Sequence, residues 1–368
     1  MNHTRKVLAR AASLAVIGLA ALTSAASHAA PGLTGAGVAD GFALSEYMNF
    51  PQQGVYDYAN APLGDGTLVG VDQEDNELLK LADTNGQSPS TAIASVPFNG
   101  GISATATQGT AYAMGIGATT IYSVSASLNL TPIATQAPIQ TNFVLTSNQA
   151  TGDLVCQCTV NGVSEIAIIN PVTGAITSLA SDVGAGAAVT VSPDGSTVYV
   201  EGNFDGSGTA TLRGYNVTNL SNIQPVSSVA APSGDWISMT EVGGGQFSGN
   251  FIFNTFGGAL ELFNPSTLSV AAIATGFTLD SFQTLDPSTG TMFLATQEGT
   301  YRLGLADGGL GSEPVGAPEP ASLALMGVGV FGLGLVRRVR TRKGTGRRAA
   351  RSRAIYGGPL LARSFAPF

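Results

Sequence analysis

Short runs of β-prone residues recur along most of the chain and predict an all-β body. They are rich in Val, Ile, Thr, Tyr and Phe, and turn residues such as Gly, Pro, Asn and Asp separate them. The apolar period of an amphipathic helix is weak between the two termini. The expected strands are Thr67–Val71, Thr110–Met114, Ile121–Val124, Asn142–Thr146, Glu165–Ile169, Thr197–Val200, Asn250–Asn254, Ala259–Phe263, Thr291–Ala295 and Thr300–Leu303.

Four of the intervening turns share one chemical plan, with proline at the second position. They are N-P-V-T-G from Asn170, S-P-D-G from Ser192, N-P-S-T from Asn264 and D-P-S-T-G from Asp286. Proline fixes φ for the second residue of a type I turn, and the side chain before it accepts backbone hydrogen bonds. The sequence therefore predicts tight reversals between antiparallel strands.

The strands and turns repeat about every 40 to 50 residues, in segments that open near Val55, Ile102, Asn142, Ala187, Trp236 and Phe282. A repeat of this length built from four short strands is typical of a β-propeller blade. About six blades fit between Gly54 and Gly311, and Val38–Met48 is expected to supply the missing strand of the last blade. Such closure removes exposed sheet edges. A β-sandwich or a β-solenoid is the alternative fold.

Two phrases strengthen the propeller interpretation. S-P-D-G-S-T-V-Y-V from Ser192 and I-N-P-V-T-G-A-I from Ile169 resemble the YVTN-type and quinoprotein-like propellers of exported bacterial proteins. The resemblance rests on these phrases and implies the same fold for residues 30–317.

The C-terminal region has three parts: Pro318-Glu319-Pro320, an uncharged apolar run over 321–336, and the basic cluster Arg337, Arg338 and Arg340. As a helix, sixteen residues span about 24 Å, slightly less than the ~30 Å hydrocarbon core of a bilayer. We expect a short transmembrane helix there, with a plain membrane anchor as the alternative to a processed signal. Residues 344–368 form a basic tail that we expect to be disordered.

This three-part order over 318–343 resembles the PEP-CTERM sorting signal of Gram-negative bacteria. The resemblance implies recognition and cleavage by an exosortase. It also implies a link to exopolysaccharide and biofilm formation, because substrates of exosortases are associated with both.

The N-terminal residues 1–29 have the features of a secretory signal peptide. Arg5, Lys6 and Arg10 precede an apolar stretch, and Ser27-His28-Ala29 provides small residues for cleavage by signal peptidase after Ala29. We therefore expect export across the inner membrane, transient anchoring by the C-terminal helix, and a final place at the cell surface or outside the cell.

Charge is distributed very unevenly along the chain. Between residues 30 and 317 only Lys80, Arg213 and Arg302 are basic, against 23 Asp and Glu, so the body has a net charge of −20. Such a body repels nucleic acid and anionic lipid, which excludes both as partners. It favours basic partners or divalent cations, although acidity also simply keeps an exported protein soluble.

Histidine is confined to His3 and His28, both in the predicted leader. A mature chain without histidine excludes Ser-His-Asp and Cys-His nucleophiles and histidine-ligated metals. A pair of carboxylates is the remaining catalytic option, as in glycoside hydrolysis. No two of the 23 acids are singled out by the sequence, so we expect no enzyme activity and name no catalytic residue.

We expect no cofactor, with calcium as the one alternative, because calcium prefers carboxylate and carbonyl oxygen. Two loops offer such oxygens: Asp72, Glu74 and Asp75 in V-D-Q-E-D-N-E, and Asn203 and Asp205 in N-F-D-G-S-G. A solvated loop between two strands for the first and a hairpin turn for the second are the simpler explanations. Cys156 and Cys158 are expected as two partly buried thiols, because residues i and i+2 of a strand stand about 6.5–7 Å apart, which is long for a disulfide. A disulfide is the alternative, because an oxidising compartment permits the bond and a local bulge would bring the two residues closer.

Two classes of function remain open. In the first, the body is a non-catalytic surface or matrix protein that binds exopolysaccharide, a partner protein or cations. In the second, it is an exported carboxylate-dependent hydrolase or lyase that acts on polysaccharide. The lack of histidine in the mature chain favours the first class.

Overall fold

The protein is described from a computed structural model. The structure describes residues 30–49, 57–63, 66–72, 77–82, 84–86, 92–95, 101–107, 109–115, 117–181, 188–202, 204, 210–232, 236–255, 257–277, 282–286, 289–296, 299–306 and 309–311. The chain divides into two compact units, Met1–Glu313 and Pro314–Phe368, and every described residue belongs to the first.

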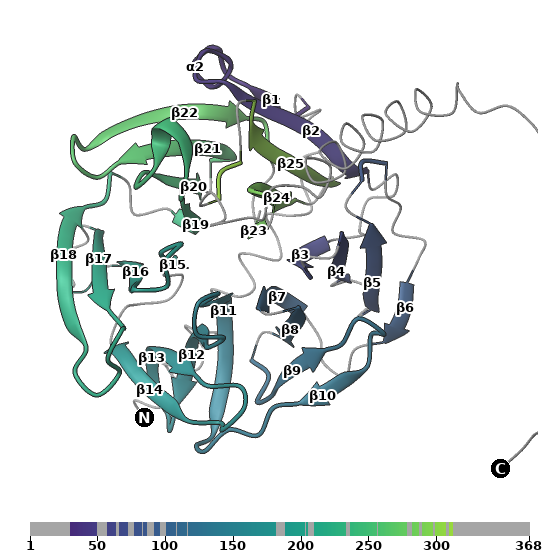
Figure 1. Cartoon of the computed structure of the whole chain (residues 1–368), viewed down its shortest axis with the longest axis vertical. Helices are drawn as coiled ribbons and strands as arrows, with labels where there is room; N and C mark the ends of the chain where they lie inside the picture. Colours follow the sequence, from purple (N-terminus) through teal and green to yellow (C-terminus); the bar gives the residue numbers. More distant parts are fainter. Residues whose placement is uncertain are drawn as a thin grey trace, which may run out of the picture. The chain divides into compact units, whose positions relative to one another are not determined.

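Six antiparallel sheets are arranged in a ring, with the strands of each sheet following one another from the centre outward (Figure 1). Four sheets consist of four consecutive strands; the fifth sheet has four consecutive strands and one N-terminal strand at its outer edge, and the sixth has three consecutive strands and one N-terminal strand at its outer edge. This is a six-bladed β-propeller, so the predicted fold is confirmed.

Blades 1 to 3 use only consecutive strands. Blade 1 contains β3 (Asp57–Pro62), β4 (Thr67–Asp72), β5 (Glu77–Ala82) and β6 (Ala92–Ser95); blade 2 contains β7 (Gly101–Thr107), β8 (Thr110–Gly115), β9 (Ile121–Val124) and β10 (Leu130–Pro132); blade 3 contains β11 (Ile139–Ser147), β12 (Leu154–Val160), β13 (Val163–Ile169) and β14 (Ile176–Ser181).

Blade 4 follows the same plan, whereas blades 5 and 6 also take up one N-terminal strand each. Blade 4 contains β15 (Val189–Val191), β16 (Thr197–Gly202), β17 (Thr211–Asn216) and β18 (Gln224–Ala230); blade 5 contains β19 (Trp236–Glu241), β20 (Phe251–Thr255), β21 (Ala259–Asn264) and β22 (Ser269–Thr275); blade 6 contains β23 (Phe282–Asp286), β24 (Thr291–Ala295) and β25 (Gly299–Leu305). We call the end of the ring at which the first strand connects to the second, and the third to the fourth, the turn end.

The N-terminal segment closes the ring, as predicted. Strand β2 (Phe42–Asn49) forms the outermost strand of blade 6, and its register runs from the pair Phe42–Leu305 to the pair Asn49–Gly299. Strand β1 (Gly32–Leu33) adds a short fifth strand to blade 5 by pairing with β22. The first described residues of the chain therefore hold the last two blades together.

The closing strand begins later than the sequence suggested, at Phe42 instead of Val38. A short helix, α2 (Gly35–Ala39), precedes it, because Thr34 caps the helix by accepting a hydrogen bond from the Gly37 amide at 3.0 Å. Gly37 is required at this position, since a Cβ there would lie 2.1 Å from the Ile273 carbonyl oxygen.

One apolar cluster fills each of the six interfaces between neighbouring blades. In the interface between blades 4 and 5, Trp236 stacks on Phe253 with 3.8 Å between ring centroids, and Phe263 packs edge-on against Trp236. These aromatic residues are buried, so they serve the core and do not form an exposed sugar-stacking surface. Burial of apolar area between blades is the main stabilising contribution.

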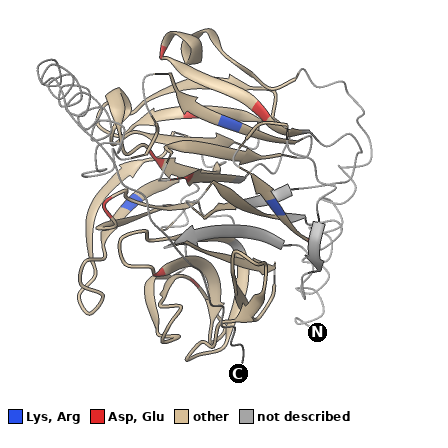
Figure 2. Ribbon diagram, turned by 45° about the vertical axis from the view of Figure 1, so that its right-hand side comes forward, with Lys and Arg blue, Asp and Glu red and all other residues tan. Residues whose placement is uncertain are grey.

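The proline-containing turns have the hydrogen bonds that their sequences predict. The Asn170 side chain accepts hydrogen bonds from the amides of Val172 and Thr173, and the Asn264 side chain accepts from those of Ser266 and Thr267. These bonds satisfy the turn backbone without charged residues. Figure 2 shows that few of the described residues are Lys, Arg, Asp or Glu.

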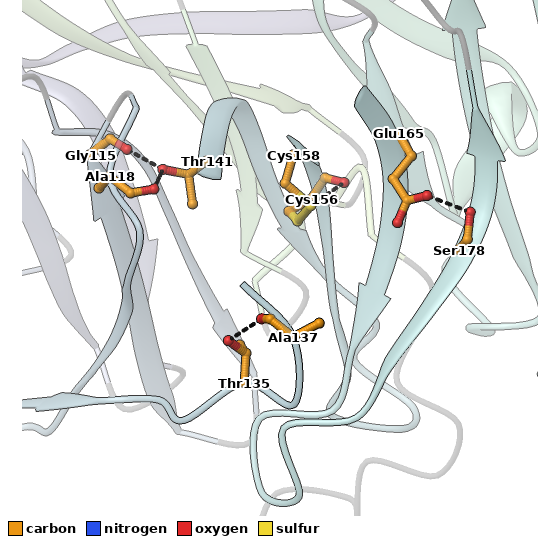
Figure 3. The surroundings of a disulfide bond; sticks show 9 residues. All are labelled: Gly115, Ala118, Thr135, Ala137, Thr141, Cys156, Cys158, Glu165 and Ser178. Atoms are coloured by element: carbon orange, nitrogen blue, oxygen red, sulfur yellow. Dashed lines mark hydrogen bonds between the residues drawn. A yellow bond between two sulfur atoms is a disulfide. The ribbon is translucent and has the colours of Figure 1, made fainter. Parts of the chain in front are cut away.

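The expectation of two free thiols was wrong, because Cys156 and Cys158 form a disulfide on β12 (Figure 3). Their Cα atoms are 5.6 Å apart, closer than in an ideal extended strand. The neighbouring strand β11 has a bulge between Thr141 and Leu145, the residues that pair with Cys158 and Cys156. The strand is therefore compressed where its partner is irregular, which sequence spacing alone does not reveal.

Candidate functional site

Two carboxylates, Asp194 and Glu241, interact at the turn end of blades 4 and 5. Asp194 belongs to the turn that follows β15, and Glu241 is the last residue of β19. Both strands are innermost in their blades (Figure 1). Because side chains alternate along a strand, Glu241 shares with Met239 the face of blade 5 that packs on blade 4.

Glu241 is partly buried in this interface. Its carboxyl oxygen Oε2 is enclosed and has no hydrogen-bond partner among the described residues. Burial disfavours the charged form, and the negative charge of Asp194 adds to the effect; together they raise the pKa of Glu241 to about 7. Glu241 is therefore close to half protonated at neutral pH.

Asp194 has the opposite environment. Its carboxylate accepts hydrogen bonds from the Ser192 hydroxyl at 2.6 Å, the Ser196 amide at 2.9 Å and the Ser196 hydroxyl at 2.9 Å. The bond from Ser192 contributes most to lowering the pKa of Asp194 below its ordinary value. The serines of the S-P-D-G-S turn thus hold Asp194 in its ionised form at the exposed surface.

Tyr199 on β16 completes the group. Burial, followed by the charges of Glu241 and Asp194, raises its pKa to about 12, so the phenol stays neutral. Its ring packs edge-on against Phe251, the residue that pairs with Glu241 across β19 and β20. Phe251 therefore forms part of the apolar surroundings that separate Glu241 from water.

A protonated carboxyl beside an ionised one is the arrangement that general acid–base catalysis uses. Glu241 is suited to donate or accept a proton near pH 7, and Asp194 to stabilise positive charge. The described residues contain no group of three or more acids, histidines or cysteines placed to hold a metal ion. The pair is therefore a candidate for proton transfer or for binding through hydrogen bonds.

The predicted calcium ligands are not brought together in the described part of the chain. Glu74, Asp75, Asn203 and Asp205 lie outside the described residues, and so does the side chain of Asp72, the last residue of β4. Strands β4 and β16, which precede the two loops, belong to blades 1 and 4. The calcium prediction stays a prediction.

Neither Asp194 nor Glu241 was predicted from the sequence as a site residue. The S-P-D-G sequence indicated a turn, and the serines around Asp194 were the one signal that its carboxylate would be stabilised. Glu241 has no local signal, because its environment comes from another blade. Glu165, one of four buried acids among the described residues, accepts a hydrogen bond from the Ser178 hydroxyl at 2.7 Å near the disulfide (Figure 3).

The sorting residues Pro318, Glu319, Pro320, Arg337, Arg338 and Arg340 lie outside the described residues, as does the apolar run over 321–336. Within the described part of the chain, no helix has the length and apolar character needed to cross a bilayer. The leader over 1–29 and the tail over 344–368 are likewise outside the described residues.

The C-terminal region matches a known family. Residues 317–339 match the PEP-CTERM protein-sorting motif, which confirms the resemblance seen in the sequence. The match covers this segment alone. It implies that an exosortase processes the chain during export and sorting.

Two solved structures are similar to the ring. A gluconolactonase from Xanthomonas campestris has a TM-score of 0.54 at 14% identity, covering 75% of this chain and 94% of its own. A provisionally assigned gluconolactonase has a TM-score of 0.51 at 11% identity, covering 72% of this chain and 92% of its own. Likeness at this level of identity shows the fold alone, and no curated protein matches the chain. The chain is thus a six-bladed β-propeller followed by a PEP-CTERM sorting motif.

Proposed function

We propose that this protein is a cell-surface or extracellular-matrix component whose propeller binds other matrix molecules without catalysing a reaction. The observation that carries the proposal is the PEP-CTERM motif at 317–339, placed directly after a closed ring. The motif implies sorting by an exosortase, and the ring is a rigid scaffold that presents many turns. Exopolysaccharide is the ligand we propose, because it is the material with which proteins sorted in this way are associated.

The surface chemistry of the ring supports a binding role. Its turns are stabilised by Asn, Ser, Thr and Asp side chains that bond to the backbone, as at Asn170 and Asn264. Polar turns of this kind suit hydrogen bonding to hydroxyl groups, and they do not depend on a histidine or a metal. A body with a net charge of −20 selects neutral or basic ligands over acidic ones.

The test uses fragment 30–317, which contains every strand of the ring. Neutral and acidic polysaccharides are immobilised, and both retention of the fragment and release of reducing ends are measured. Retention of the fragment without release supports the proposal. Failure to bind any polysaccharide, or release of reducing ends, overturns it.

The Asp194–Glu241 pair favours a second candidate, an exported carboxylate-dependent polysaccharide hydrolase or lyase. The opposite directions of the two pKa changes are the observation behind it. If turnover is found, Glu241→Gln and Asp194→Asn should each abolish it while binding persists. Turnover that survives both substitutions would remove this pair from the mechanism.

A cellular experiment tests the sorting half of the proposal separately. A tag placed before the motif, at a surface turn of the ring, follows the protein in cells with and without the exosortase. Accumulation of a longer, membrane-held form without the enzyme is the expected result. Identical size and location in both strains would contradict sorting by exosortase, whatever the ring binds.

A further inference from the structure

Exposed aliphatic side chains gather at one end of the described ring. Seven large apolar residues are well exposed in the described part of the chain. Val163, the first residue of β13 and the partner of Val160 on β12, lies at the end opposite the turn end. The other six lie at or beside the turn end: Val38, Val172, Leu220, Val226, Leu268 and Val270.

Three neighbouring blades present one such residue on the same turn, between the third and fourth strands. Val172 of blade 3 is 91% exposed, Leu220 of blade 4 is 36% exposed and Leu268 of blade 5 is 54% exposed. None of these turns contains a charged residue. These three side chains, which we call the tips, therefore project from turns that carry no charge of their own. The nearest described acid on blade 3 is Asp153, whose carboxylate accepts a hydrogen bond from the Asn170 side chain at 2.9 Å.

Helix α2 presents a fourth tip at blade 6. Val38 lies in its last turn and is 63% exposed. Two residues later, the carbonyl oxygen of Asp40 accepts a hydrogen bond from the Gln246 side chain at 3.1 Å. Gln246 belongs to the turn between β19 and β20, which is at the turn end. Val38 therefore lies near the same end as the other three.

Turn geometry does not force these side chains outward. Leu128 in the corresponding turn of blade 2 has the same left-handed backbone as Leu268, with φ of 61° against 57°. Leu128 is nonetheless buried in the core between blades 1 and 2, whereas Leu268 is exposed. Single exposed aliphatic residues are ordinary, but four placed at one end of consecutive blades form a pattern.

We propose that the turn end of the ring docks on a lipid surface through Val38, Val172, Leu220 and Leu268. Polar residues separate these tips, so they do not form the continuous apolar area that a protein partner buries. A bilayer interface is flat and receives separated apolar side chains at once, each surrounded by headgroups. The proposal is independent of what the ring binds elsewhere.

The course of the chain supports this choice of partner. The last described residues lie at the turn end, where Gly243 donates a hydrogen bond to the Leu310 carbonyl at 2.8 Å and Leu310 donates to the Gly290 carbonyl at 2.6 Å. Five residues separate Gly311 from the start of the sorting motif at 317. An extended segment of this length reaches at most about 20 Å.

Charge selects the kind of lipid. The body has a net charge of −20, so an anionic surface repels it. We therefore expect docking on zwitterionic lipid, weakened when anionic lipid is added and partly restored by salt, which screens the repulsion. Docking driven by cationic side chains would have the opposite dependence on both variables.

The experiment uses fragment 30–317, which closes its own ring and lacks the apolar run over 321–336. Sedimentation with phosphatidylcholine vesicles is measured for the wild type and for Val172→Ser/Leu220→Ser/Leu268→Asn. Asparagine at 268 tolerates the left-handed backbone. Val163→Ser, 50% exposed at the opposite end, is the matched control. We expect each removed tip to weaken partitioning about fivefold, from loss of apolar burial.

A positive readout comes from site-specific labelling, since both native cysteines are in the disulfide. Val172→Cys and Val163→Cys are coupled to an environment-sensitive fluorophore, and vesicles should shift only the emission at 172. No partitioning by the wild type, or equal effects of the triple variant and Val163→Ser, overturns the proposal. So does self-association without lipid that the triple variant abolishes, because the tips would then form an interface between copies.

Discussion

Replacing Glu241 by Gln should make the ring more stable at alkaline pH and leave it unchanged in acid. The pKa of Glu241 is raised from 4.5 to about 7 in the folded protein. The folded state therefore holds this proton where the unfolded state has lost it, so the free energy of unfolding falls as pH rises from about 4.5 to about 7. Below this interval both states are protonated, and above it the penalty is complete. Glutamine mimics the neutral carboxyl at every pH.

The magnitude follows from the same interval. At about 1.36 kcal/mol per pH unit, the difference between the folded and unfolded pKa values of Glu241 corresponds to about 3 kcal/mol of unfolding free energy. Solvent screening of a partly buried group reduces this to about 2 kcal/mol. At pH 8, Glu241→Gln should therefore exceed the wild type by about 2 kcal/mol, or about 5 °C in Tm for a domain of this size. At pH 4.5 the two proteins should be equal.

Urea unfolding of fragment 30–317 between pH 4.5 and 8.5 measures this difference. Trp236, the single tryptophan, is buried in the same interface between blades 4 and 5 and reports unfolding by fluorescence. Glu46→Gln, at an exposed position on β2, is the control for loss of a negative charge. Asp194→Asn should give a smaller gain at pH 8, because burial contributes more than Asp194 to the pKa of Glu241. If the free energies of unfolding of the wild type and Glu241→Gln change in parallel with pH, folding does not raise the pKa of Glu241, and this prediction is wrong.

Three further predictions concern the scaffold. Gly174→Ala should destabilise the ring by more than about 2 kcal/mol, because Gly174 has φ +69° and the new Cβ would lie 2.1 Å from the Ala134 carbonyl oxygen. Gly162 also has a positive φ, +86°, but open space around it, so Gly162→Ala should lower the free energy of unfolding by only about 1 kcal/mol in the same urea titration. Phe42→Ala should lose about 3 kcal/mol from the core between blades 5 and 6, whereas Val38→Ala should change the melting temperature little in lipid-free buffer. Cys156→Ala/Cys158→Ala should lower the free energy of unfolding by about 1–2 kcal/mol, since the loop that the disulfide closes is very short. Because both cysteines are buried, reductant followed by maleimide should label them in the wild type only when urea is also present.

The ring could be predicted because its signals are local and repeated. Turns such as Asn170-Pro171 and Ser192-Pro193 fix reversals within a few residues, and the spacing between them gives the number of blades. The closing strand was predictable for a related reason. The last blade had room for only three strands, and the N-terminal segment contained a strand that belonged to no other blade. Only its start was wrong, because Thr34 and Gly37 form a helix that strand patterns do not reveal.

The candidate site could not be predicted, because it depends on contacts across a blade interface. Glu241 is one of 23 acids in the body, and what distinguishes it is its position opposite Phe251 and near Asp194, 47 positions earlier in the chain. The disulfide escaped prediction for a geometric reason. An ideal strand places Cys156 and Cys158 too far apart, whereas the bulge in β11 lies beside a compressed segment of β12.

The pairing of β2 with β25 sets the order of events for a chain exported from its N-terminus. Phe42 crosses early, yet its partner Leu305 belongs to the last strand before the sorting segment. Blades 1 to 5 can therefore form while β2 is still unpaired. The ring becomes continuous only when almost the whole chain has been exported. A product cut short before blade 6 would leave β2 without its partner strand and would expose the apolar faces of blades 5 and 1. Completion of the ring thus depends on the last strand before the sorting motif.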